Sequence, residues 1–526
     1  MRRCLLQSLC REPVVREVGY ACLVGLVAIY PRVVNVGWFY GSDEAIYMLA
    51  SREIANGHVM YRDFSLGSYP LAFCVLGLFY RVLGCTLLVA TSVSVAFAAL
   101  TLFMYYFLLR HSNKPPVALL SVAFLSYIPS FFILSRHFML EVPMTMFIMA
   151  SILLMRRGDA TWAGVMMGLA LVTKPTSLPF LVAMLVVLTA GRSSSTGALR
   201  KFLVGSVASI VSVLTPFLIL CPGAYFDSLK VNAVRWGFPD LLQSYFLEDY
   251  RTVLTAIALV SLILFAVFPK RMKTDRVDAF FGISFILSLV LFQFYNFSSQ
   301  FAYPLSIPLA YLATRLGVET YRALRKIDTM PIQGFDTRIV VIMVLLFLVV
   351  SSNGLIISYR VIYEAAAQDY LEVFPEEQRA RYPEDERARY VWLFLASKVR
   401  TMTSPSDRIL THPMIAFLAE RELFTSADTS DKVQVTDVWG YSIRFDIQNY
   451  SDQPGGLEYA RRFVGIYNLD SAVSLTIRTV QSRQARLIVG TDRYIIWPKV
   501  REVLVQYYSQ VLEYEGWEFW ALNQGP

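Results

Sequence analysis

Long apolar segments recur along the chain from its N-terminus to about residue 358. Inside a bilayer every backbone N–H and C=O must find a hydrogen-bond partner within the protein, so runs of this kind form transmembrane helices. The chain is 56% hydrophobic and only 17% charged, which is typical of a polytopic membrane protein and excludes an ordinary soluble enzyme. The predicted spans cover residues 18–38, 86–109, 116–134, 142–155, 161–173, 176–190, 201–221, 252–268, 279–294, 302–316 and 338–358.

Clusters of lysine and arginine follow every second apolar segment. Cytosolic loops of membrane proteins are enriched in these residues, so the alternation predicts a multi-pass protein of the cell membrane with a cytosolic N-terminus and about eleven spans. The net charge of +8 therefore reflects membrane topology and does not indicate nucleic-acid binding. The clusters are Arg110/Lys114, Arg156/Arg157, Arg192/Arg200/Lys201, Lys270/Arg271/Lys273 and Arg322/Arg325/Lys326.

Two segments cannot be assigned by length alone. The stretch 161–190 is either one tilted helix or two short spans; Lys174-Pro175 in its middle and the cations at both flanks favour two spans with Lys174 at the external turn. Residues 70–83 are too short for a span and predict an interfacial helix within an external loop of residues 39–85.

The chain changes character near residue 359. Residues 359–526 lack long apolar runs and are numerous enough for one small core. Helices at 389–399, 414–421 and 500–511 and strands at 408–411, 485–489 and 518–522 alternate in an α/β manner. The predicted fold is an all-α polytopic membrane domain, residues 1–358, followed by a small extracytoplasmic α/β domain, residues 359–526. The six cysteines show no metal-ligand spacing.

The adjacent carboxylates Asp43 and Glu44 follow the first apolar segment. A carboxylate near hydrocarbon is costly unless it is paired, solvated or metal-bound, which makes both residues functional candidates. The alternative is a structural role at a helix N-terminus, where Ser42, Asp43 and Glu44 cap the following helix. The two roles are compatible.

Three other predicted external segments carry charged residues beside apolar ones. Arg136, His137 and Glu141 lie between two spans, where they form either an ordinary turn with Arg136 paired to Glu141 or part of a site. Lys174 either snorkels to the surface or binds an anion, because a lysine without a partner is expensive in an apolar hairpin. Arg235 is either solvated or a ligand-binding cation.

Acidic residues and cations thus gather on one predicted face beside hydrocarbon. This combination suits a lipid phosphate substrate: cations hold the phosphate, and a carboxylate acts as general base on an acceptor hydroxyl or orients a divalent metal such as Mg²⁺ or Mn²⁺. Apolar helices hold the lipid tail. The acidic residues are Asp43, Glu44, Asp63 and Glu141, and the cations are Arg62, Arg136, Lys174 and Arg235.

These residues fall in motifs that resemble those of the integral-membrane GT-C glycosyltransferases. The chain is most similar to the branch that contains the protein O-mannosyltransferases and the aminoarabinose transferase of lipid A modification. The resemblance extends to about residue 316 and rests on Asp43-Glu44-Ala-Ile-Tyr47, Gly57-His-Val-Met-Tyr61-Arg-Asp63-Phe, Tyr69-Pro70-Leu71, Leu140-Glu141-Val-Pro143 and Thr173-Lys174-Pro175.

The resemblance implies inverting transfer of a sugar from a polyprenyl-phosphate donor to a protein, lipid or glycan acceptor on the extracytoplasmic face. It implies that Asp43 is the catalytic base or a metal-orienting acid, that Glu44 and Glu141 complete the acidic set, and that Asp43 and Glu141 are the metal ligands. It also implies that Lys174 contacts the donor phosphate. The full set of predicted substrate-binding residues is Arg62, Asp63, Arg136, His137, Lys174, Arg235 and Tyr303. The segment Gly67-Ser-Tyr-Pro70 departs from the Pro-rich motif of the aminoarabinose branch and leaves the donor sugar open.

Two other classes of function remain open from the sequence. A transporter or flippase of lipid-linked sugars is the main alternative, although transporters often have two similar halves with polar residues at mid-membrane, whereas the charges here cluster at loop edges. A receptor or scaffold is the third, and it predicts that the carboxylates are dispensable.

Overall fold

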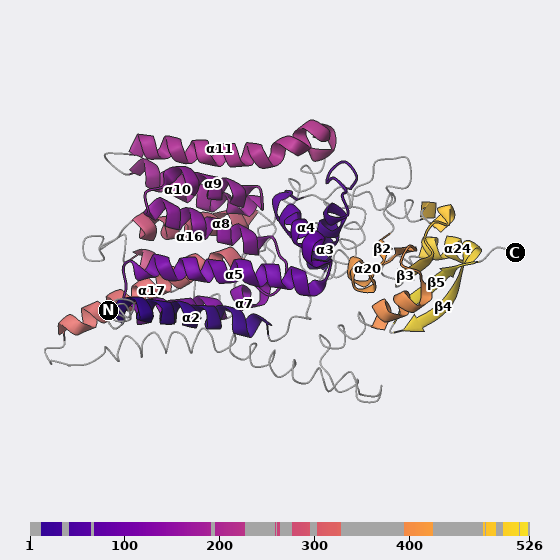
Figure 1. The fold of residues 1–526 in the computed structure, drawn as a ribbon, viewed down its shortest axis with the longest axis horizontal. Coiled ribbons are helices and arrows are strands. Elements are labelled where there is room, and N and C mark those ends of the chain that lie inside the picture. The colour runs from indigo at the N-terminus through magenta and orange to yellow at the C-terminus, as the bar shows by residue number, and fades with distance from the viewer. Residues whose placement is uncertain are drawn as a thin grey trace, which may run out of the picture. The chain divides into compact units, whose positions relative to one another are not determined.

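The computed structural model of the chain is mainly helical, with a small sheet near the C-terminus (Figure 1). It divides into two compact units. The first comprises Met1–Trp38, Tyr69–Pro216 and Ala233–Asp369, and the second comprises Phe39–Ser68, Phe217–Asn232 and Tyr370–Pro526. The structure describes residues 12–33, 42–64, 68–190, 195–226, 258, 260–263, 276–294, 302–327, 394–423, 477–478, 480–490, 498–514 and 516–523.

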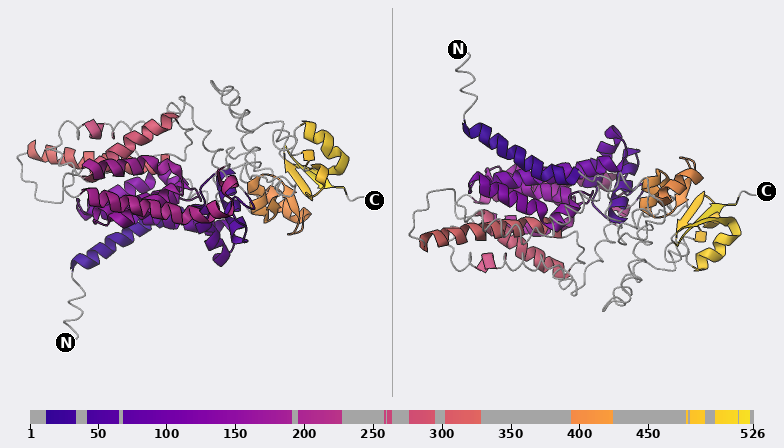
Figure 2. Two further views of the ribbon diagram at one scale, coloured as in Figure 1. Left: turned by 90° about the horizontal axis from the view of Figure 1, so that it is seen from above. Right: turned by 90° about the horizontal axis from the view of Figure 1, so that it is seen from below.

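The first unit is a bundle of apolar helices that pack along their lengths (Figures 1 and 2). Its described helices are α2 (Glu12–Val33), α4 (Leu71–Leu83), α5 (Leu87–Arg110), α6 (Pro115–Tyr127), α7 (Pro129–Leu134), α8 (Glu141–Arg156), α9 (Ala160–Leu171), the 3-10 turn η1 (Pro175–Ser177), α10 (Leu178–Ala190), α11 (Ser195–Leu220), α16 (Arg276–Phe294) and α17 (Ala302–Ile327). Helix α5 packs against both α2 and α8, and α16 packs against α10 and α17.

The described helices agree with the sequence on two local points. The stretch 161–190 is broken at Lys174-Pro175 into α9 and α10, and the short helix predicted over 70–83 is present as α4. By length and hydropathy, Leu87–Arg110 and Thr196–Leu220 are able to cross a bilayer, and shorter apolar helices accompany them. The total of eleven spans stays a prediction, since residues 338–358 and most of 252–268 lie outside the described part of the chain.

Two of the basic turns lie at the same end of the bundle. Arg156, in the last turn of α8, donates from Nη1 to the carbonyl of Leu108 at 3.1 Å and from Nη2 to Oγ of Ser112 at 2.9 Å. These bonds bring the α8–α9 turn to the α5–α6 turn, as the positive-inside pattern predicts. Glu141, the first residue of α8, lies at the opposite end, about 22 Å away along a helix that rises 1.5 Å per residue.

Small residues allow α9 and α11 to approach closely. A Cβ added to Gly164 would lie 2.0 Å from the carbonyl oxygen of Phe202, and one added to Gly205 would lie 2.2 Å from that of Thr161. The hydroxyl of Ser206 donates to the carbonyl of Gly164 at 3.0 Å. This is the small-residue packing by which helices associate in membranes, where no hydrophobic force drives them together.

Gly164→Ala is therefore expected to push α9 and α11 apart and to destabilise the bundle by about 1–3 kcal/mol, the usual cost of overpacking. Gly197→Ala is the matched control, because nothing lies within 4 Å of a Cβ at that position of α11. Thermal unfolding of the detergent-purified variants checks the prediction. Equal midpoints for the two variants would contradict the close approach.

The second unit contains a mixed five-stranded sheet. Its strands are β1 (Arg408–Leu410), β2 (Glu422–Leu423), β3 (Leu487–Gly490), β4 (Tyr508–Tyr514) and β5 (Trp517–Leu522), in the order β2-β1-β3-β5-β4. Strand β1 pairs in parallel with β2 and β3, whereas β5 pairs in antiparallel fashion with β3 and β4. The accompanying helices are α20 (Pro413–Ala419), α24 (Pro498–Tyr507) and α3 (Ser42–Ala55), and α3 is contributed by the predicted first external loop.

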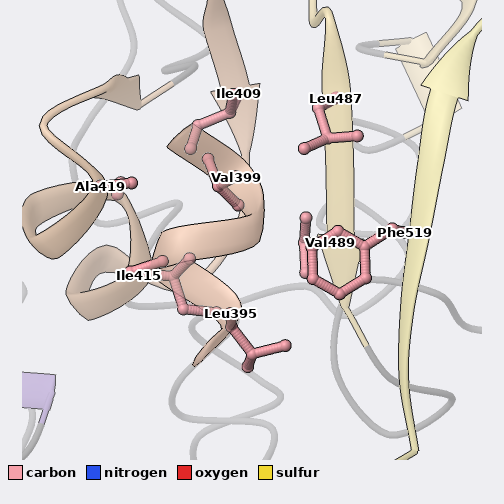
Figure 3. Packing of buried hydrophobic residues seen from close by; sticks show 10 residues of the cluster. Leu395, Val399, Ile409, Ile415, Ala419, Leu487, Val489 and Phe519 are labelled. Atoms are coloured by element: carbon pink, nitrogen blue, oxygen red, sulfur yellow. The ribbon is translucent and has the colours of Figure 1, made fainter. Parts of the chain in front are cut away.

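A buried apolar cluster holds helices onto one face of this sheet. Figure 3 shows Leu395, Val399 and Ile415 turned toward the strand residues Leu487 and Val489. Tyr508, Trp520 and residues of α24 form a second buried cluster with Ile488. The predicted α/β domain thus has a real core in its described residues.

One predicted element of this domain is wrong in part. The helix predicted over 500–511 ends at Tyr507, and residues 508–511 belong to β4. The apolar residues Val500, Leu504, Tyr507 and Val511 continue a helical period, but β4 pairs with β5 along a hairpin, and its inter-strand hydrogen bonds outweigh that period. Strand pairing in a hairpin thus overrides the helical period here.

Topology can be checked with single cysteines in a background without the native ones. Ser406→Cys, in the turn before β1, is expected to react with an impermeant thiol reagent in intact cells. His111→Cys, in the α5–α6 turn, is expected to react only after permeabilisation. Both positions are exposed. Labelling of His111→Cys in intact cells would invert the predicted orientation.

Candidate functional site

A buried ion pair joins two of the predicted site residues. Lys174 Nζ donates to Oε1 of Glu141, linking the turn between α9 and η1 to the first residue of α8. The Glu141 side chain is 0% exposed and that of Lys174 13% exposed. Lys174 is therefore not the lone cation that its apolar hairpin suggested, and Glu141 pairs with Lys174 instead of with Arg136.

Two buried polar atoms beside this pair lack a hydrogen-bond partner within the described part of the chain. They are Oε2 of Glu141 and the hydroxyl of Tyr303. Tyr303, in the first turn of α17, stacks on Phe131 at 4.5 Å and is close enough to Glu141 to interact with it electrostatically. An unsatisfied buried polar atom costs about 1–3 kcal/mol, so the two atoms indicate a place for a polar ligand or water.

Arg32, which was not among the predicted site residues, is fully buried at the end of the bundle that holds Glu141. From the last turn of α2 its guanidinium donates to Oγ of Ser135 at 2.5 Å, to the carbonyl of Ala28 at 2.9 Å, and to both Oγ and the carbonyl of Ser126 at 2.9 Å. The signal that points to it is simple. An arginine inside a predicted span, as in Tyr30-Pro31-Arg32, is a functional candidate by its desolvation cost alone.

Arg136 and His137 also lie inside this cluster. Each is 4% exposed. The guanidinium of Arg136 lies 5.6 Å from the ring centroid of Phe132, and that of Arg32 lies 5.4 Å from the same ring. The His137 carbonyl accepts a hydrogen bond from Ser94 of α5 at 2.5 Å, which fixes the turn before α8. The first unit therefore brings together Arg136, His137, Glu141, Lys174 and Tyr303, with Arg32 added.

Asp43 and Glu44 lie in the first turn of α3, in the second unit. Glu44 is 0% exposed, whereas Asp43 is half-buried and so remains reachable. Carboxylates in the first turn stabilise a helix because they interact favourably with the positive end of the helix dipole. The helix start predicted at Ser42 is confirmed, and the catalytic role of the two carboxylates stays a prediction.

Arg62 and Asp63 form a surface turn in the second unit. The guanidinium donates to both oxygens of Asp63 at 2.7 Å, and Asp63 also accepts from the backbone N–H of Val59 at 2.7 Å. The hydrogen bonds from Arg62 hold the pKa of Asp63 below its usual value. Tyr61, at a positive φ of 68°, fastens the turn by donating to the Ser68 carbonyl at 2.6 Å. Both charged residues thus have a structural use, and their substrate role stays a prediction.

Both residues of the predicted metal site, Asp43 and Glu141, lie in the described part of the chain. No three His, Cys, Asp or Glu side chains come together among the described residues. One oxygen of Glu141 already accepts from Lys174. Asp43 and Glu141 belong to different units, and their role as metal ligands stays a prediction. Arg235 lies outside the described residues.

Comparison with known proteins relates this geometry to a family. Residues 68–219 match the family described as dolichyl-phosphate-mannose-protein mannosyltransferase. A search of curated proteins finds no significant match.

Solved structures resemble almost the whole chain. The structure of ArnT from Cupriavidus metallidurans bound to undecaprenyl phosphate has a TM-score of 0.58 at 13% identity, covering 97% of this chain and 99% of that one. The apo form of the same ArnT has a TM-score of 0.54 at 13% identity, covering 97% and 98%. The Archaeoglobus fulgidus oligosaccharyltransferase has a TM-score of 0.43 at 13% identity, covering 96% and 74%. The resemblance that the loop motifs predicted is thus confirmed at the level of fold: the chain has the fold of this ArnT, and its residues 68–219 match the mannosyltransferase family.

Proposed function

We propose that this protein is a membrane glycosyltransferase that moves a sugar from a polyprenyl-phosphate donor to an acceptor on the extracytoplasmic face, with inversion at the anomeric carbon. The observation that carries the proposal is the Glu141–Lys174 pair, whose second carboxylate oxygen is buried and without a hydrogen-bond partner among the described residues. A water-poor polar site at one end of an apolar bundle suits a substrate with a polar head and a lipid tail. The fold shared with an ArnT that binds undecaprenyl phosphate supports this substrate class.

The proposed roles follow from the chemistry of inverting transfer. The acceptor oxygen attacks the anomeric carbon, the bond from that carbon to the phosphate oxygen breaks, and the lipid phosphate leaves with the electron pair. Asp43 takes the acceptor proton as general base. Lys174 and Arg136 stabilise the charge that develops on the leaving phosphate. Glu141 holds Lys174 in place through their ion pair and offers its second oxygen to a sugar hydroxyl.

A second buried ion pair in the described helices does not favour the transporter alternative. Arg315 of α17 donates to both oxygens of Asp278 of α16, at 2.8 and 3.0 Å, and the hydroxyl of Tyr311 donates to the same carboxylate at 3.0 Å. Asp278 lies in the first turn of α16, which begins just after the predicted cytosolic cluster Lys270/Arg271/Lys273. A pair so well satisfied cross-links two helices and leaves little freedom for an ion to bind or leave.

The proposal is tested by supplying the purified protein with polyprenyl-phosphate sugars and measuring release of free polyprenyl phosphate together with the glycosylated product. Mass spectrometry of lipid that copurifies with the protein selects the sugars to supply. Donor consumption coupled to product supports the proposal. Movement of an intact donor across proteoliposomes without its consumption would replace it with the transporter.

A further inference from the structure

Helix α3, which carries Asp43 and Glu44, is buried along most of its length. Residues 44–51 are all buried, and a run of that length passes round a helix more than twice. Part of the cover comes from the C-terminal domain, because α20 packs against α3 (Figure 1). A helix from the first predicted external loop thus packs against a helix of a domain more than 350 residues further along the chain.

One side-chain contact fixes the far end of α3 to that domain. Arg52, in the last turn of α3, donates from Nη2 to the carbonyl oxygen of Arg421 at 3.1 Å. The side chain of Arg52 is 14% exposed, so the bond is partly shielded from water. A hydrogen bond with a charged donor in such surroundings is stronger than one between neutral groups.

The accepting carbonyl is itself held rigidly. Helix α20 ends at Ala419, Glu420 adopts a positive φ of 56°, and the N–H of Arg421 closes the helix by donating to the Ala416 carbonyl at 3.0 Å. The buried guanidinium of Arg421 then donates to Oγ1 and the carbonyl of Thr403 at 2.8 Å, and to the carbonyl of Arg400 at 3.1 Å. These bonds tie the end of α20 to the preceding helical segment, so the carbonyl presented to Arg52 cannot turn freely.

We infer that Arg52 is a positioning residue: by binding the Arg421 carbonyl it uses the C-terminal domain to hold α3, and with it Asp43, in the orientation needed for transfer. The inference rests on the proposed function of Asp43. Asp43 and Arg52 lie about 14 Å apart along the helix axis. A tilt of about 5° at one end therefore displaces the other by about 1 Å, an error that can cost as much as 10²-fold in rate.

The activity arm of the test compares Arg52→Met and Arg52→Lys with the wild type. Arg52→Met is expected to lower kcat for transfer by about 10-fold or more with little change in the KM for donor, because orientation of the base is lost and not donor contact. Arg52→Lys, which still donates to a carbonyl, is expected to recover part of the rate. Lys499→Met is the control, since it removes an exposed cation of the same domain.

Coupling to Asp43 separates positioning from general damage. If Arg52 acts through Asp43, then Arg52→Met is expected to cost little further rate in an Asp43→Asn background. An equal loss in both backgrounds would overturn the inference.

A labelling arm tests the tether without any sugar transfer. Ser51→Cys, at a fully buried position of α3, is expected to be protected from a thiol reagent in the otherwise native protein and to become reactive with Arg52→Met but not with Lys499→Met. Unchanged protection with Arg52→Met would overturn the inference. If the wild type transfers no sugar while this protection is lost on substitution, the tether stands and the proposed function fails.

Discussion

Replacement of Asp43 by Asn is expected to lower sugar transfer by about 10²–10⁴-fold, the range typical of losing a general acid or base. The amide has the size of the carboxyl group and caps helices about as well, so α3 is expected to stay folded. It cannot take up the acceptor proton. Since Asp43 lies in the first turn of α3 and is only half-buried, an acceptor can reach it without unfolding of the helix. The measurement is the initial rate of polyprenyl phosphate release, with thermal unfolding measured in parallel.

Asp159→Asn provides the matched control. Asp159 caps α9, where its Oδ1 accepts from the N–H of Trp162 at 3.3 Å, and it lies at the end of the bundle with the basic turns. The same change of carboxylate to amide at a helix start is expected to leave transfer intact there. If Asp43→Asn also leaves transfer intact, Asp43 has no part in the chemistry, and its buried neighbour Glu44 becomes the carboxylate to test.

The local features of this site could be predicted from the sequence. Lys174-Pro175 breaks an apolar stretch because proline cannot continue the helix, and the structure ends α9 there. Glu141 begins α8 as the Leu-Glu-Val-Pro motif indicates, and Ser42 begins α3. The positive-inside pattern placed Glu141 and the Arg156 turn at opposite ends of one helix. Each of these follows from a few neighbouring residues.

The pairings could not be predicted in the same way. Glu141 had a nearer cation in Arg136, yet it binds Lys174, 33 residues away, because α8 and α9 form a hairpin that returns the chain to the same end. Arg32 lies within the predicted span 18–38, where no site residue was predicted. The bond from Arg52 to Arg421 spans 369 positions and depends on how a separate domain packs. Contacts of this length are set by tertiary structure and leave no local pattern.

Removal of one partner of the Glu141–Lys174 pair is expected to lower both the stability of the protein and its rate of sugar transfer, and the two losses can be measured separately. Lys174→Met leaves a fully buried carboxylate without its cation, and breaking a buried pair in this manner costs about 3–5 kcal/mol. Adding Glu141→Gln to Lys174→Met removes the unpaired buried charge and so is expected to reduce that loss of stability. The double variant Glu141→Gln with Lys174→Met removes both charges and leaves side chains of similar size, so it is expected to recover most of the stability that Lys174→Met loses.

Transfer is expected to behave differently from stability. If Lys174 stabilises the charge on the leaving phosphate, the double variant remains slow although it is folded, by about 10²-fold or more, because the lost interaction is stronger in the transition state than in the ground state. Binding of polyprenyl phosphate without a sugar is expected to weaken as well. Thermal unfolding, lipid binding and turnover of the two single variants and the double variant give these quantities separately.

Asp278→Asn with Arg315→Met is the matched control for the double variant. It neutralises the other buried pair, which joins α16 to α17 and lies away from the proposed reaction. Its stability is expected to change by a similar amount and its turnover to stay near that of the wild type. If the Glu141/Lys174 double variant regains both stability and turnover, the pair is only a cross-link between α8 and the α9–α10 turn. Arg62, Arg136 and Arg235 would then remain as the predicted phosphate-binding cations, and Arg136→Met would be the first variant to test because Arg136 is buried beside Phe132 in the same unit.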